Sequence, residues 1–189
     1  LQLLCAAASL RGASWGAKDA IVFAPSADGP IMMVSATGGE PKPVTTLDKA
    51  AGETGHRLPS FLPDGRRFLY VVVPERTDGF PTKIGSIDGE PGPIVVTAKS
   101  VAIYARPGYL VYLNQGGVFA RPFDAPTLKV SGTPRAIADC DSNVFGPYSK
   151  IIRVVNLPKP VPSSTNPQIV TEFGNDDMVS TQLFIPGFG

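Results

Sequence analysis

The fold of this chain is decided by the stretch Ser60-Phe61-Leu62-Pro63-Asp64-Gly65-Arg66-Arg67-Phe68-Leu69-Tyr70. An aromatic residue comes first, a Pro-Asp-Gly turn follows, and a run of apolar and aromatic residues closes the stretch. Proline fixes the backbone entering a turn, aspartate hydrogen-bonds its own backbone, and glycine supplies a positive φ. The stretch therefore predicts a β-hairpin, with Asp64 as a turn former.

Two other segments have the same order of aromatic residue, turn and apolar run, namely 14–23 and the more divergent 104–112. The three runs end at Phe23, Tyr70 and Tyr112, which are 47 (70 − 23) and 42 (112 − 70) residues apart. A repeat of about 40–50 residues is typical of the blades of a β-propeller. The blade cores are expected to contain aromatic side chains, listed here in chain order: Trp15, Phe23, Phe61, Tyr70, Tyr109 and Tyr112.

Each repeat contains two further strand-like segments, separated by a glycine–proline turn. The first of them lies at 30–35, 82–87 and 117–123, and the second at 43–47, 93–96 and 135–138. No segment before residue 140 has sustained helical periodicity. We therefore predict an all-β fold, a partial β-propeller of four-stranded antiparallel blades with an irregular C-terminal segment.

The predicted blades occupy about 12–50, 56–98 and 100–140, within a propeller region of residues 1–142. Residues 143–189 do not continue the repeat. They contain a polyproline-like linker at 156–164 and are otherwise expected to form an irregular tail or a divergent blade. Propellers use roughly four to eight blades, so the chain is expected to be a fragment or to complete its ring with other parts of its parent chain.

Composition narrows the classes of function. The chain has 189 residues, of which 43% are apolar and 40 are proline or glycine (20 + 20), which suits short strands and tight turns. A net charge of +1 without a basic stripe argues against a nucleic-acid partner. Cys5 and Cys140 match no zinc-binding spacing, and two unpaired thiols are favoured over a disulfide.

The quoted residues carry a family resemblance. The run 61–70, with His56 upstream, resembles the Pro-Asp-Gly blade motif of TolB-like and WD-repeat-like propellers. With 12–25 and the phrase Thr45-Thr46-Leu47-Asp48, it is similar to the C-terminal propeller region of bacterial transmembrane serine/threonine protein kinases. This resemblance implies a non-catalytic binding or sensing module on the outer, periplasmic or extracellular side of a membrane.

No motif supports catalysis. Gly12-Ala13-Ser14-Trp15-Gly16 matches the pattern of a nucleophile elbow, but a hairpin and strand are expected after it rather than a helix. His56 is the only histidine, and a hydrogen bond between neighbouring blades is its favoured role. Glu172-Phe173-Gly174 resembles a kinase metal-binding triplet, without the other kinase motifs. We expect no catalytic, cofactor-binding or metal-binding residues, and no cofactor.

The acidic residues that could bind calcium are Asp139, Asp141 and the cluster 175–177. Their spacing matches no known loop, and solvated turn carboxylates are the favoured interpretation.

Two functions are left open, beside the possibility that the fragment has no independent activity and does not fold alone. The first is a non-catalytic propeller that binds a protein, peptide or cell-envelope ligand, within a larger envelope or signalling protein and without direct membrane insertion of this segment. The alternative is the propeller of a prolyl-oligopeptidase-like serine hydrolase, whose catalytic domain would lie outside this sequence. A fold-level resemblance does not choose between them.

Overall fold

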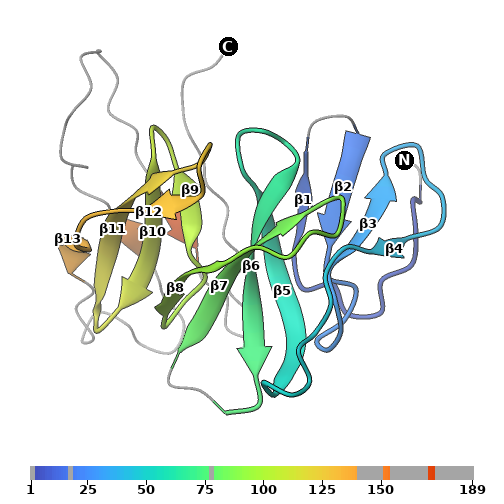
Figure 1. Cartoon of the computed structure of the whole chain (residues 1–189), viewed down its shortest axis with the longest axis horizontal. Coiled ribbons are helices and arrows are strands. Elements are labelled where there is room, and N and C mark those ends of the chain that lie inside the picture. Colours follow the sequence, from blue (N-terminus) through green and yellow to red (C-terminus); the bar gives the residue numbers. More distant parts are fainter. Residues whose placement is uncertain (1–2, 17–18, 77–78, 140–150, 154–169, 173–189) are drawn as a thin grey trace.

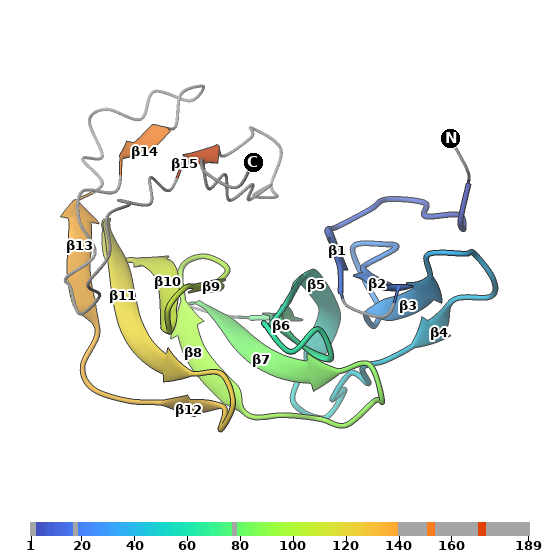
Figure 2. The ribbon, with the colours of Figure 1, turned by 90° about the horizontal axis from the view of Figure 1, so that it is seen from above.

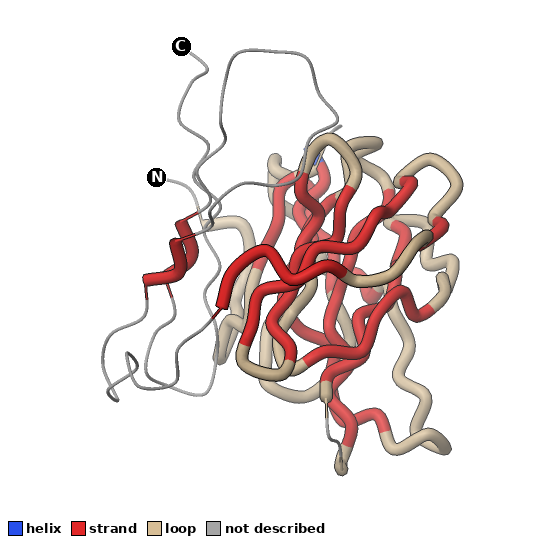
Figure 3. Tube along the Cα trace, turned by 90° about the vertical axis from the view of Figure 1, so that its left-hand side faces the viewer, coloured by secondary structure: helices blue, strands red, loops and turns tan. Residues whose placement is uncertain are grey.

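The computed structural model describes residues 3–16, 19–76, 79–139, 151–153 and 170–172. Strands and turns make up this part of the chain, and it contains no α-helix (Figure 3). None of the described residues belongs to a helix long and apolar enough to cross a membrane. The predicted all-β class is therefore confirmed.

The strands form three consecutive antiparallel sheets. The first contains β1 (Ala13–Trp15), β2 (Ala20–Phe23), β3 (Met32–Ser35) and β4 (Lys42–Pro43), in that order. The second contains β5 (Glu53–Phe61), β6 (Arg67–Pro74), β7 (Phe80–Ser86) and β8 (Ile94–Ala98). The third contains β9 (Ile103–Ala105), β10 (Tyr109–Asn114), β11 (Gly117–Asp124), β12 (Lys129–Val130) and β13 (Arg135–Asp139), with β12 and β13 both paired to β11.

The three sheets stand side by side and fan out from one another (Figure 1). Seen from above, their first strands lie innermost and their last strands outermost (Figure 2). Strand β1 contacts β5 at this inner side. Consecutive antiparallel sheets that radiate in this way, two of them four-stranded and the third with an additional strand on β11, are the blades of a β-propeller. The predicted partial propeller is thus the fold of the described residues.

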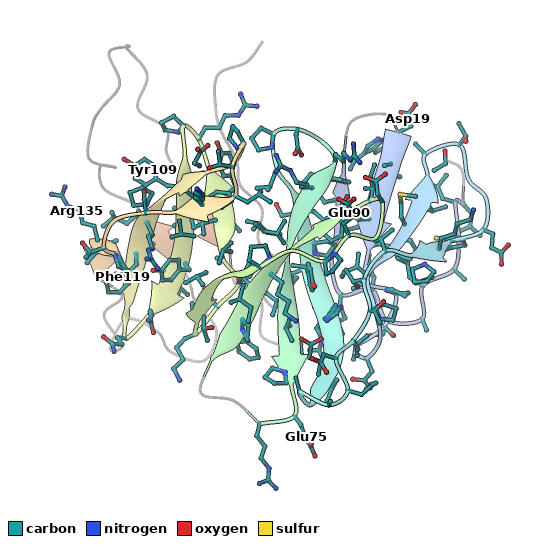
Figure 4. All side chains as sticks on the ribbon, in the orientation of Figure 1. Asp19, Glu75, Glu90, Tyr109, Phe119 and Arg135 are labelled. Atoms are coloured by element: carbon teal, nitrogen blue, oxygen red, sulfur yellow. The ribbon has the colours of Figure 1, made fainter. Side chains whose placement is uncertain are left out.

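The turns lie at two ends of the sheets. Asp19, in the β1–β2 turn, and Glu75, after β6, mark these opposite ends (Figure 4). At the same end as Asp19, the predicted Asp64 turn joins β5 to β6. Its Oδ1 accepts hydrogen bonds from the backbone N–H groups of Arg66 (3.0 Å) and Arg67 (2.9 Å). The predicted role of Asp64 as a turn former is confirmed.

Both interfaces between sheets are apolar, and the two kinds of face occur in the same order in each. The earlier sheet contributes an aliphatic face, and the later sheet contributes a face that carries aromatic rings. Between the first and second sheets the facing residues are Val22, Ala24, Ile31, Met33 and Val44 on one side, and Phe61, Phe68, Tyr70, Val72 and Ile87 on the other. Between the second and third they are Leu62, Leu69, Ile84, Val95 and Ala98, against Tyr104, Leu110, Tyr112, Phe119 and Phe123. Full burial of one such side chain contributes about 1.5–3 kcal/mol.

Backbone hydrogen bonds also join the first two sheets. The N–H of His56 donates to the carbonyl of Gly29 (2.9 Å), and the N–H of Leu58 donates to the carbonyl of Arg11 (2.9 Å). Gly55 permits this approach, because a Cβ there would lie 2.5 Å from the carbonyl oxygen of Ala27. These contacts fix the first sheet against β5 independently of side-chain packing.

The predicted core aromatics are only partly confirmed. Phe23, Tyr70 and Tyr112 are buried, and Phe61 and Tyr109 are half-buried against core clusters. The prediction for Trp15 is wrong, because its side chain is 65% exposed. It lies on the face of the first sheet that points away from the second sheet.

The fourth strand of the first sheet is shorter than the predicted 43–47. Strand β4 ends at Pro43, and the following Val44 and Thr45 turn into the interface, where both are buried. Beyond residue 142, the structure describes only β14 (Ile151–Arg153) and β15 (Val170–Glu172), which pair antiparallel. The predicted linker at 156–164 lies outside the described residues.

Candidate functional site

The most concentrated group of buried polar side chains lies where the first two sheets meet. We call it the His56 network; it contains Thr45, Glu53, His56 and Lys83. His56 projects from β5 and is only 1% exposed. Its Nδ1 lies 2.8 Å from Oγ1 of Thr45, and its Nε2 lies 3.0 Å from Oε2 of Glu53. Thr45 and Glu53 are also buried.

The partners of His56 define its tautomer. Burial lowers the pKa of His56 more than the hydrogen bond and charge of Glu53 raise it, so the ring is neutral near pH 7. A carboxylate only accepts hydrogen bonds, so Nε2 carries the proton and donates to Glu53. Nδ1 then accepts from the hydroxyl of Thr45. The same Thr45 Oγ1 accepts the backbone N–H of Ile31 (2.8 Å), which completes a chain of donors into the first sheet.

Glu53 is charged although it is buried. Burial alone would raise its pKa, but hydrogen bonds from Lys83, the backbone N–H of Asp48 and His56 outweigh burial and hold its pKa below the ordinary value of 4.5. The Lys83 ammonium donates to Oε1, and the N–H of Asp48 donates to Oε2 at 2.8 Å. The carboxylate is therefore fully engaged, as a buried charge requires.

Tyr70 forms the apolar wall of the network. Its ring centroid lies 4.7 Å from that of His56, in a tilted arrangement. Burial, followed by the charge of Glu53, raises the pKa of Tyr70 well above its usual range. Tyr70 is thus a neutral phenol at any physiological pH.

A hydroxyl, a histidine and a carboxylate in a row are the elements of a hydrolase triad, but this arrangement cannot act as one. A catalytic hydroxyl must reach a substrate carbonyl, with an oxyanion site beside it. The hydroxyl of Thr45 is buried between two sheets, and its oxygen already accepts the N–H of Ile31. The predicted hydrogen-bonding role of His56 between blades is confirmed, with Thr45 as the link.

Sequence reasoning missed the partners of His56 for a geometric reason. On a regular strand, residues three apart point to opposite faces, so Glu53 and His56 would not meet. The register of β5 against β6 shifts between Glu53 and Gly55, and this irregularity brings both side chains to one place. No signal in the sequence identifies Lys83 of β7 as the cation.

The other residues considered for chemistry are placed apart from this network. Ser14 lies on β1, which is followed by β2 and not by a helix, and its hydroxyl accepts the N–H of Phe61 at 3.1 Å. Asp139 is in β13 and Glu172 is in β15. Phe173, Gly174, Asp141 and 175–177 lie outside the described residues, as does Cys140. Across the described ranges, no three His, Cys, Asp or Glu side chains are grouped so that they could bind a metal ion.

A second charged group, not predicted from the sequence, lies beside β5. The Nε of Arg57 donates to the carbonyl of Ala27 at 2.8 Å. Burial, then the positive charge of the nearby Arg11, lowers the pKa of Arg57, while Asp28 opposes the shift. The Nε of Arg11 is buried and has no hydrogen-bond partner among the described residues. Two guanidinium groups thus lie close together near the inner strands.

No protein-family model matches this chain, and no curated protein matches it. Among solved structures, it is similar to the β-propeller domain of the Trilobed protease from Pyrococcus furiosus, whose propeller has an open velcro topology. The two chains share 11% identity with a TM-score of 0.48, over 86% of this chain and 52% of the other. This chain therefore spans about half the length of that chain. The fold assignment rests on the strand topology and the packing of the sheets.

Proposed function

We propose that this chain is a non-catalytic propeller module that binds a protein, peptide or cell-envelope ligand. The observation that carries the proposal is the burial of His56 and its partners. The hydroxyl–histidine–carboxylate group of the described residues is used to join two sheets and has no access to a substrate. The described strands and turns would therefore provide a binding surface rather than a reaction centre.

We place the ligand surface at the inner side of the sheets, near Arg11 and Arg57. Two neighbouring guanidinium groups favour an anionic group on the ligand, because arginine binds carboxylate and phosphate oxygens with planar, paired donors. The module would act within a larger envelope or signalling protein, outside the cytoplasm, with its ring completed by other parts of the parent chain. A kinase-linked sensor is the specific form that the sequence motifs favour.

The non-catalytic assignment is tested with a fluorophosphonate probe and an aryl ester substrate on the purified chain. We expect no covalent labelling, and no hydrolysis above the buffer rate, for the wild type or for Thr45→Val. Labelling that Thr45→Val abolishes would overturn the assignment. The sequence of the parent gene decides between contexts: an upstream kinase and membrane span support the sensor, and a downstream hydrolase domain supports the alternative.

Binding is tested on an array of peptides matched in length, half acidic and half neutral. We expect acidic peptides to be retained preferentially, and retention to weaken with added salt. Arg11→Gln is expected to lower it. Lys42→Gln is the matched control, because Lys42 is an exposed cation on β4, the last strand of the first sheet. Equal loss in both variants, or no retention of any peptide, would contradict the proposed surface.

A further inference from the structure

The polar contacts that hold the first sheet against the second converge on one strand, β5. The N–H of His56 donates to the carbonyl of Gly29 at 2.9 Å. The N–H of Leu58 donates to the carbonyl of Arg11, also at 2.9 Å. The side chain of His56 adds a hydrogen bond to Thr45, which follows β4. We call these contacts the β5 joint.

The closed joint suits the neutral ring of His56 and opposes the charged one. Nδ1 accepts the hydroxyl hydrogen of Thr45, whose Oγ1 already accepts the N–H of Ile31. A proton on Nδ1 would turn it into a donor, and the hydroxyl hydrogen of Thr45 would lose its acceptor in a buried place. The ring of His56 is only 1% exposed, so the added charge would also be held away from water.

The ionisable groups that face His56 belong mainly to its own sheet. Lys83 of β7 and Lys49, in the connection that leads to β5, oppose a charged ring, whereas the carboxylate of Glu53 favours it. Tyr70 of β6 faces the ring with a neutral phenol. Glu53, Lys83 and Tyr70 would stay beside His56 if the first sheet moved away. Opening of the joint would thus give an imidazolium access to water and leave it its carboxylate partner.

The interface between the second and third sheets has no such group. His56 is the only histidine of the chain, and the described apolar cluster between these sheets contains no carboxylate. The N–H of Ala102, next to β9, donates to Oγ1 of Thr82 in β7 at 3.4 Å, and both of these groups are neutral and buried. Acidification from pH 7 to about 5 should therefore act on the first of the two interfaces and leave the second unchanged.

We propose that the β5 joint is an acid-sensitive device: a proton from solvent on Nδ1 of His56 favours separation of the first sheet from β5, while the second and third sheets stay together. Arg11 lies on the first-sheet side of the joint and Arg57 lies on β5. The same movement would separate the two guanidinium groups of the proposed ligand surface. Weaker binding of an anionic ligand in acid is a consequence that rests on the proposed function, whereas the opening of the joint does not.

The test follows amide hydrogen exchange of the whole chain by NMR between pH 7 and about 5, with each rate expressed as protection relative to the intrinsic rate at that pH. The amide of Leu58 reports the joint, and the amide of Ala102 reports the other interface. We expect the protection of Leu58 to fall by up to about tenfold per pH unit, the limit for uptake of one proton. The protection of Ala102 should stay constant. Constant protection of Leu58, or an equal fall at both amides, would overturn the inference.

His56→Gln is the matched variant, because glutamine keeps a neutral donor and acceptor but takes up no proton. We expect the protection of Leu58 in this variant to be independent of pH over the same range, and a fall equal to that of the wild type would overturn the inference.

A second measurement decides the matter if His56→Gln does not fold. The Cε1–H signal of the single imidazole, followed by NMR in the wild type, gives the titration of His56 in the folded chain. We expect a pKa below the ordinary value of 6.5, because burial outweighs the influence of Glu53. A pKa at or above 6.5 would overturn the inference. None of these measurements uses a ligand, so failure here is distinct from failure of the proposed ligand surface.

Discussion

Nε2 of His56 lies 3.0 Å from Oε2 of Glu53, and both side chains are buried. Through Thr45 this pair reaches the backbone of Ile31 in the first sheet, and through Glu53 it reaches Lys83 in β7. A polar chain thus crosses the apolar interface between the first two sheets. Such a chain is favourable only when every member has its partner.

Removal of Lys83 is expected to leave the Glu53 carboxylate without its cation. We predict that Lys83→Met lowers the free energy of unfolding by about 3 kcal/mol, the lower end of the range for breaking a buried ion pair, because Lys83 is 23% exposed. Lys42→Met is the control, since it makes the same change at an exposed strand position. Urea denaturation measures both. A loss no larger than that of the control would show that Lys83 is dispensable for the network.

Acid is expected to destabilise the chain in two stages. The folded pKa of His56 lies below its ordinary 6.5, so the unfolded state binds more protons and stability falls as pH drops below that value. The folded pKa of Glu53 lies below 4.5, so a second loss follows as pH falls through that region. Both contributions are fully present above pH 6.5.

The first stage belongs to His56, the only histidine. We expect His56→Gln to be less stable than the wild type at pH 7 and to lose less further stability between pH 6.5 and about 5. Denaturation midpoints across this range make the measurement. If the two proteins lose stability in parallel, His56 is not the group that titrates.

The parts of the fold that local chemistry dictates were predictable from the sequence. A few consecutive residues are enough to predict the turn at Asp64 and the apolar runs that end at Phe23, Tyr70 and Tyr112. Trp15 was mispredicted for a different reason. Its pattern is that of a blade aromatic, but burial depends on a facing surface, which a strand pattern cannot supply.

The His56 network could not be predicted, because it depends on an irregularity in β5. Alternation along a strand separates Glu53 from His56, and only the register shift brings them together. Thr45 and Lys83 reach the same place from a connection and from another strand. Contacts of this kind become visible only when the sheets are packed.

Two substitutions at Asp64 distinguish the contribution of its hydrogen bonds from that of its negative charge. We predict that Asp64→Ala costs about 1–3 kcal/mol, because the N–H groups of Arg66 and Arg67 lose their acceptor. Asp64→Asn keeps an acceptor oxygen and loses only the ion pair with Arg67, so its cost should be about 0–1 kcal/mol. The comparison is made by thermal denaturation. If both substitutions cost the same, the charge rather than the turn geometry is what matters.

Gly55 controls the approach of the first sheet to β5. A methyl group at this position would meet the carbonyl oxygen of Ala27 at 2.5 Å and Cα of Asp28 at 3.2 Å. We predict that Gly55→Ala lowers the free energy of unfolding by about 1–3 kcal/mol, as overpacking does. It should also speed hydrogen exchange at the His56 amide, whose acceptor is Gly29.

Gly39→Ala is the matched control for Gly55→Ala. A methyl group at Gly39 meets nothing within 4 Å, but the φ of +126° strains any side chain, so this variant loses stability without touching the interface. Exchange at the His56 amide should then stay close to the wild-type rate under native conditions. Faster exchange in both variants would mean that the amide reports global opening, and the close approach at Gly55 would not be what protects it.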